Sequence, residues 1–207
     1  MKLTVAIFIR SRLALQALAT RMRTVKYGLA CGLLAFTMTA CNSTNINRYS
    51  GETPELKPEQ FFTGFITAHG VIKNFSGDVI RRFNADIDSC WKDGVGTLDE
   101  RFIFDDGERQ TRLWTLSPNP DGSYAATAGD VIGTGTARWS GHAFFLDYVL
   151  RVALDDGSID LRIDDRMYRV DDNIVINESR MMKFGIGVGS ILLTLIRHPE
   201  LPVNCVT

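Results

Sequence analysis

The sequence predicts an all-β fold, an antiparallel up-and-down meander of about ten strands that closes into a barrel or bends into a strongly curved sheet. Two observations support this fold. Apolar and polar residues alternate along most of the chain after residue 60, as in strands that bury one face. Asp-Gly pairs, which favour type I′ hairpin turns, punctuate this part of the chain at residues 93–94, 106–107, 121–122 and 156–157.

The expected strands follow one another closely, with no long helical pattern between them. The alternation is clear where Ile159, Leu161 and Ile163 are interleaved with charged residues. Residues 186–197 contain glycines and β-branched residues, so we expect a strand there rather than a helix. The expected strands are residues 61–72, 78–89, 96–104, 109–117, 123–130, 134–140, 142–154, 158–170, 173–183 and 186–197. A lipocalin-like or fatty-acid-binding-protein-like barrel is favoured over a sandwich or an open sheet.

The first 40 residues have the features of a lipoprotein signal peptide. Three basic residues precede an apolar run at residues 27–38, which is too short to span a bilayer. The sequence Met38-Thr-Ala-Cys41 then resembles a bacterial lipobox, with Met in place of the usual Leu. By that resemblance Cys41 is the lipidated residue, and its acyl chains would hold the protein at a membrane. A start at Met22 would give a signal of normal length, so the true start is either Met1 or Met22.

Charge also divides the chain in two. Of the 23 Lys and Arg residues, six lie in residues 1–40, where there is no acid. The remaining 17 cations face 24 acids in residues 41–207, a net charge of −7, which argues against a nucleic-acid partner. Residues 41–60 are polar and contain two prolines, so they are expected to be an acylated cysteine and a flexible tether. Residues 61–207 form the expected β-barrel domain.

Position 42 bears on localisation. Asn42 follows the lipidated cysteine where an Asp would resemble the inner-membrane retention signal. The predicted location is therefore the outer membrane, with the domain facing the periplasm. A porin-type barrel embedded in lipid is not expected, because such a barrel needs no acyl anchor.

The sequence shows no catalytic motif, metal-binding motif or cofactor-binding motif, so an enzyme is the least favoured class. Two charged residues are nevertheless placed among apolar ones in the strand pattern. Asp165 is in register with Ile163 and Met167, and Arg81 lies between Val79 and Phe83. One interpretation is that these residues form an internal salt bridge or lie at the mouth of the barrel. The other is that they are polar anchors inside an apolar cavity. The candidate ligand-binding residues are Arg81, Trp114, Asp165 and Tyr168.

Two cysteines remain once Cys31 is removed with the signal and Cys41 is acylated. In an oxidising compartment Cys90 and Cys205 form one disulfide or stay as two free thiols. The sequence leaves both alternatives open, because it does not give the separation of their Cα atoms.

Four segments also resemble an uncharacterised family of bacterial lipoproteins, known only as a domain of unknown function. They are residues 104–114, 129–133, 164–168 and 182–189, and the resemblance covers residues 48–198. It implies a lipocalin-like barrel together with export and an acyl anchor. It implies no activity, substrate or catalytic residue.

The leading hypothesis for the function is an outer-membrane-anchored lipoprotein that binds a small amphipathic or lipid-like molecule, such as a fatty acid, in a β-barrel. The alternative is a cell-envelope structural or assembly protein that acts through its outer surface. The membrane is contacted through the acyl chains on Cys41 in both cases, and no protein partner can be named.

Overall fold

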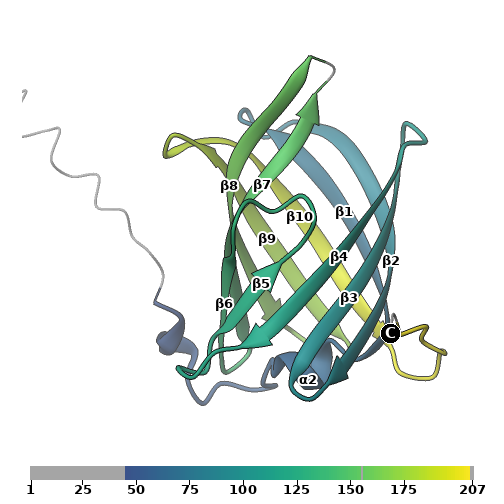
Figure 1. Cartoon of the computed structure of the whole chain (residues 1–207), viewed down its shortest axis with the longest axis vertical. Coiled ribbons are helices and arrows are strands. Elements are labelled where there is room, and N and C mark those ends of the chain that lie inside the picture. The colour runs from purple at the N-terminus through teal and green to yellow at the C-terminus, as the bar shows by residue number, and fades with distance from the viewer. Residues whose placement is uncertain (1–44, 155, 206–207) are drawn as a thin grey trace, which may run out of the picture. The chain divides into compact units, whose positions relative to one another are not determined.

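The computed structural model describes residues 45–154 and 156–205. In this part of the chain ten antiparallel strands form one closed barrel, in which each strand pairs with its neighbours in sequence and β1 pairs with β10 (Figure 1). Two short helices, η1 (Ile46–Tyr49) and α2 (Pro58–Phe61), precede the strands. The strands are β1 (Gly64–Asn74), β2 (Val79–Lys92), β3 (Val95–Phe104), β4 (Arg109–Pro118), β5 (Tyr124–Thr127), β6 (Gly135–Ser140), β7 (Ala143–Leu154), β8 (Gly157–Arg169), β9 (Ile174–Lys183) and β10 (Ile186–His198). The predicted up-and-down barrel is confirmed.

Closure of the barrel joins the first strand to the last. The register between β1 and β10 runs from Phe65 opposite His198 to Asn74 opposite Gly189. Closure pairs the two terminal strands of the meander along most of their length, so neither is left as a free edge. Alternate residues on every strand then point into the barrel, and the apolar core lies inside.

The hairpin turns follow the predicted type at only some positions. The Asp93-Gly94 pair has positive φ at both residues, 53° and 77°, as a type I′ turn requires. At Asp106-Gly107 only the glycine has positive φ, 87°, which fits a longer loop with one left-handed residue. The Phe184-Gly185 turn also has positive φ at both residues, 52° and 79°, without the Asp-Gly pair that is typical of such turns.

The predicted flexible tether is wrong from residue 45 onward, because this segment packs on the barrel. Leu56 is completely buried, and its backbone N–H donates to the Gly141 carbonyl over 2.7 Å. The Arg169 guanidinium donates to the Glu55 carbonyl. A Cβ atom at Gly141 would lie 1.8 Å from the Tyr49 carbonyl oxygen, so the close crossing requires glycine there. The apolar residues of this otherwise polar stretch explain the packing. The free energy gained by burying them outweighs the conformational entropy that a free tether would keep.

The proposed signal peptide, Cys41 and residues 42–44 lie outside the described residues. Residues 45–207 form one compact unit. We call this unit the barrel domain. Its core is built from its own residues, as expected of a segment that folds independently.

One end of the barrel is closed by the segment around α2 (Figure 1). Phe61 and Phe62 are buried there, and Phe62 packs edge-on against Phe144 with ring centroids 5.5 Å apart. The Phe62 carbonyl accepts hydrogen bonds from the Ser89 hydroxyl and the Trp91 indole N–H. We call Phe61 and Phe62 the plug. These contacts hold the plug in the end of the barrel.

The opposite end carries the β1–β2, β3–β4, β7–β8 and β9–β10 hairpin turns (Figure 1). Apolar side chains are exposed at three of these hairpins and in the loop after β5. They are Phe75, Val79, Ile80, Ile132, Leu154, Phe184 and Ile186. We call this end the open end, because the α2 segment lies at the other one. Near it the inward-facing Phe83, Phe102 and Phe104 pack against one another.

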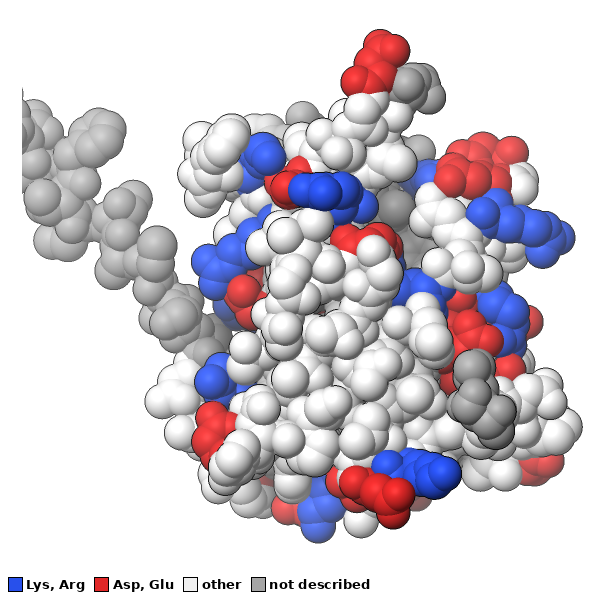
Figure 2. Space-filling view, viewed as in Figure 1, with Lys and Arg blue, Asp and Glu red and all other residues white. Residues whose placement is uncertain are grey.

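Ion pairs join neighbouring strands on the outer wall. Arg162 contacts Asp147 across β7 and β8, and Arg151 contacts Asp160 on the same strand pair. Figure 2 shows charges of both signs side by side on the visible face. No helix in the described part of the chain is long and apolar enough to cross a membrane.

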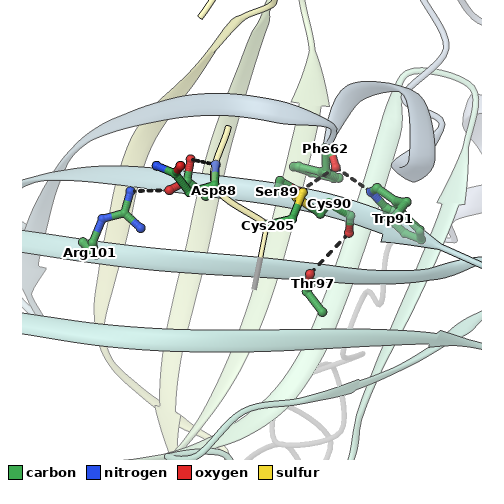
Figure 3. Close-up of a disulfide and its surroundings, with 9 residues drawn as sticks. Phe62, Asp88, Ser89, Cys90, Trp91, Thr97, Arg101 and Cys205 are labelled. Atoms are coloured by element: carbon green, nitrogen blue, oxygen red, sulfur yellow. Dashed lines mark hydrogen bonds and ion pairs between the residues drawn. A yellow bond between two sulfur atoms is a disulfide. The ribbon is translucent and has the colours of Figure 1, made fainter. Parts of the chain in front are cut away.

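The C-terminal tail is fixed to the outside of β2. Cys90 and Cys205 form a disulfide with a Cα–Cα distance of 5.7 Å (Figure 3). Next to it, the Asn204 backbone N–H donates to Asp88, whose other carboxylate oxygen accepts from Arg101 (Figure 3). The inward-facing Ser89 and Trp91 bind the plug, while the outward-facing Cys90 binds the tail, so one short stretch of β2 holds both ends of the domain.

We expect the disulfide to stabilise the domain. The Cys90→Ser, Cys205→Ser double variant should lose about 2–4 kcal/mol of unfolding free energy, because the bridge closes a long loop in the unfolded chain. Urea unfolding of the oxidised barrel domain and of the variant measures this difference. Reduced wild-type protein is the control and should match the variant. Two thiols that react with a labelling reagent in the unreduced protein would contradict the bridge.

Candidate ligand-binding site

The barrel encloses a cavity of about 130 Å³, which is the candidate site. Its wall is mainly apolar and comes from both halves of the barrel together with Phe62 of the plug. The apolar lining includes Ile66, Ala68, Ile87, Leu98, Phe144 and Leu195. Each of these strand residues lies on the inward face of its strand, so the alternation of the sequence builds the wall directly.

Polar side chains interrupt this wall in the same inward phase. Glu100 alternates with Leu98 and Phe102 on β3, and Arg112 alternates with Trp114 on β4. The remaining polar lining comes from β7, β8 and β9. It comprises Tyr148, Asp165, Asn177 and Ser179. The interior therefore combines an apolar pocket with a small number of polar groups, as ligand sites commonly do.

The first half of the polar lining is centred on Arg112. Arg112 lies opposite Glu100 in the β3–β4 register, with 3.8 Å between Nη1 and the Glu100 Oε2 atom, which is too long for a hydrogen bond. The guanidinium instead makes three hydrogen bonds of 2.7–3.0 Å to Asp130, in the loop that follows β5. Arg112 is thus paired mainly with Asp130, and Glu100 is left with a longer ionic contact.

The second half is centred on Asp165, which is 7% exposed and lies opposite Ser179 in the β8–β9 register. The Ser179 and Tyr148 hydroxyl groups face the carboxyl group and act to lower its pKa. Ser179 has a single hydroxyl proton, and its Oγ is also 2.9 Å from the Asn177 Oδ1 atom. The Ser179 proton is donated to Asn177, and Asp165 Oδ1 has no hydrogen-bond partner in the protein, so this group of side chains is short of donors.

Burial raises the pKa of both carboxyl groups. It brings the pKa of Glu100 to about 7, against the opposing effects of the Arg112 charge and a hydrogen bond from Trp114. It brings the pKa of Asp165 to about 6, against the hydrogen bonds from Ser179 and Tyr148. Burial lowers the pKa of Arg112, but the hydrogen bonds to Asp130 and the charge of Glu100 outweigh this effect, so Arg112 stays charged.

Two of the four predicted ligand-binding residues line the cavity. Asp165 is inside the barrel, in register with Ile163 and Met167 as expected, and Trp114 lines the wall and packs edge-on against Tyr148. The cavity also lies against β7 through Leu146, the cross-strand neighbour of Asp165.

The other two predicted residues lie elsewhere. Arg81 is at the open end of the barrel, where it pairs with Asp106 and Glu108 of the β3–β4 turn and stacks on Phe104 at 3.6 Å. Its long side chain reaches these acids at the rim rather than the cavity. Tyr168 faces the outer wall, where it packs against Tyr49 of η1, because it is out of phase with Asp165.

Sequence reasoning missed Glu100, Arg112, Asn177 and Ser179. The signal that identified Asp165 also applies to Glu100, which lies between the inward-facing Leu98 and Phe102. Arg112, Asn177 and Ser179 each have a polar residue at one of the two neighbouring inward positions, so the same signal is weaker for them. Polar residues therefore occupy both faces of β4 and β9, so the inward phase is harder to assign from the sequence. Asp130 could not be found in this way, because it lies in a loop and reaches Arg112 only in the closed barrel.

No group of three or more His, Cys, Asp or Glu side chains in the described ranges is placed to hold a metal ion. The chemistry that these residues offer is recognition by hydrogen bonds and charge inside an apolar wall.

Comparison with known proteins supports the fold and gives the family. The structure is similar to that of the S-type phycobiliprotein lyase CPES from Guillardia theta, with a TM-score of 0.50 and 12% sequence identity over 67% of this chain and 89% of that chain. At this identity the likeness concerns the lipocalin-like fold alone. No curated protein matches the sequence. The profile of DUF3833, a family described as protein of unknown function, matches residues 35–197, so the chain belongs to the DUF3833 family.

Proposed function

We propose that the barrel domain binds a small amphipathic molecule in its interior, and that acyl chains on Cys41 hold the protein at the outer membrane facing the periplasm. The observation that supports binding is the cavity, an apolar chamber with a few buried polar groups on its wall. The proposed anchor rests on the residues around Cys41 in the sequence.

The buried carboxyl groups favour a binding role over a purely structural one. A charged group inside a barrel costs free energy unless it is paired, and replacing it with an apolar residue commonly stabilises a protein. Glu100 and Asp165 each have one carboxylate oxygen without a hydrogen-bond partner in the protein. A core selected only for stability would not keep both groups, so a ligand that contacts them explains their presence.

The volume of the cavity limits the size of the ligand. An engineered cavity of about 150 Å³ holds one benzene molecule. A cavity of about 130 Å³ therefore accommodates a head group with a few carbon atoms. A longer chain would have to extend toward the open end, where Phe83 and Phe102 continue the apolar lining.

The ion pairs on the outer wall support a domain surrounded by water. Arg–Asp pairs lie across β7 and β8, where a barrel embedded in lipid would expose an apolar band. The acyl chains on Cys41 would then provide the contact with the membrane. Two or three chains suffice for stable attachment, because each buried CH₂ contributes about 0.8 kcal/mol.

We expect the barrel domain to bind straight-chain alcohols, with affinity rising about fourfold per CH₂ from 1-butanol to 1-hexanol as each methylene is buried. Isothermal titration calorimetry measures this series. Ala68→Phe places a ring in the cavity and should abolish binding, whereas Ala153→Phe, on the outer face of β7, should leave it unchanged. Circular dichroism checks that both variants fold. The absence of saturable heat with every alcohol would refute binding in the cavity.

The raised pKa values also predict how stability depends on pH. Glu100 and Asp165 bind protons more tightly in the folded than in the unfolded chain, so the free energy of unfolding contributed by them falls as pH rises from about 4 to about 7. The Glu100→Gln, Asp165→Asn double variant should therefore exceed wild type in stability by roughly 2 kcal/mol or more near pH 8, and by much less near pH 5.

Urea unfolding at the two pH values measures this difference. Glu178→Gln, an exposed change on β9, is the control and should follow wild type at both. A double variant that is less stable than wild type near pH 8 would contradict the assigned cost of the two carboxylates.

Lipidation is tested on the full chain in Gram-negative cells. Cys41→Ala should lose all incorporation of labelled palmitate, because the thioether forms only on that thiol. Cys31→Ala removes the cysteine inside the apolar run at residues 27–38, and this variant should retain the label. Palmitate that persists in Cys41→Ala would exclude Cys41 as the anchor.

A further inference from the structure

Three buried polar atoms on the wall of the cavity lack a hydrogen-bond partner in the protein. They are Glu100 Oε2, Asp165 Oδ1 and Asn177 Nδ2. Asp165 is 7% exposed and Asn177 is 1% exposed, so neither side chain can turn to bulk water. Glu100 keeps 14% of its side-chain surface exposed and lines the same cavity. Two of the three atoms are acceptors on acidic groups, so the wall calls mainly for hydrogen-bond donors.

The charges around the cavity have a clear sign. Among the described residues that line it, the charged side chains are Glu100, Arg112 and Asp165. Arg112 is already held by Asp130 through three hydrogen bonds. When Glu100 and Asp165 are ionised, the cluster of these four residues therefore carries one positive and three negative charges.

The surrounding groups do not change this sign. Glu100 is approached by Arg112 from β4, by Trp114 from the same strand and by the charges of Asp130 and Asp165. Asp165 is approached by Tyr148 from β7, by Ser179 from β9 and by the charges of Arg112 and Asp164. Burial holds the Tyr148 phenol in its neutral form by raising its pKa. Arg112 is the one cation in this set, and its strongest contacts are made to Asp130.

We propose that the site selects amphipathic molecules whose head group donates hydrogen bonds and carries a positive charge, in the order amine, alcohol, carboxylate. An ammonium group would donate to Glu100 Oε2 and Asp165 Oδ1 and balance the excess negative charge. An alcohol offers one donor and no charge. A fatty-acid carboxylate would bring a further negative charge and no donor, so the structure argues against the fatty acid that the strand pattern alone suggested.

The inference rests on the proposed binding function and refines it, so the test separates the two. Calorimetry with the barrel domain compares hexylamine, 1-hexanol and hexanoate, which share one chain and differ in the head group. Near pH 8 hexylamine should bind about tenfold or more tightly than hexanoate, the size expected for charge-assisted hydrogen bonds, with 1-hexanol between them.

Neutralising the carboxylates should remove the preference. In the Glu100→Gln, Asp165→Asn double variant the affinity ratio of hexylamine to hexanoate should fall to about threefold or less. Glu178→Gln on the outer face of β9 should keep the wild-type ratio. Should the double variant not fold, the ratio of hexylamine to 1-hexanol affinity in wild type is measured near pH 8 and near pH 5. Neither compound titrates in this range, whereas both protein carboxyl groups are largely protonated near pH 5, so the ratio should fall there.

The outcomes are distinct. Equal or tighter binding of hexanoate near pH 8 overturns the head-group preference and leaves binding in the barrel intact. A preference for hexylamine that survives both in the double variant and near pH 5 also overturns it, since the two carboxylates would not be its source. No binding of any of the three compounds refutes the binding function, and this inference with it.

Discussion

The pairing of β1 with β10 is the constraint on which the rest of the structure depends. It joins the two edges of the meander and satisfies their backbone groups, so that every strand acquires one inner and one outer face. A residue in the inner phase then has no route to solvent except through the cavity or the ends of the barrel. Closure thus commits Glu100, Arg112 and Asp165 to the interior together with the apolar residues that flank them.

The two ends of the barrel differ because the chain uses one of them for its own packing. The segment before β1 seals one end with Phe61 and Phe62, and the tail after β10 is fixed to β2 beside it by the Cys90–Cys205 disulfide. The opposite end consists of hairpin turns with exposed apolar side chains such as Phe75 and Phe184. The interior is therefore sealed at one end by the chain's own packing, whereas hairpin turns form the other end.

The interior balances stability against recognition. Its apolar wall supplies most of the driving force for folding, whereas the carboxyl groups oppose folding at neutral pH. Arg112 does not offset both of them, because Asp130 holds its guanidinium. The polarity that results is the opposite of what a carboxylate ligand needs. The barrel fold by itself does not distinguish a cationic from an anionic ligand, whereas the sign of the buried charge does.

The sequence by itself determined the strands, their order and the inward phase of Asp165, because period-2 alternation is a local property of the chain. It did not determine what surrounds each inward residue. The pairing of Arg112 with Asp130, the placement of Arg81 at the rim and the packing of residues 45–60 on the barrel all join positions that are distant in sequence or separated by a turn. The pairing of Cys90 with Cys205 depends on the same closure, which brings the tail back to β2. Only the tertiary structure decided these contacts, because they depend on the distances that the closed barrel sets.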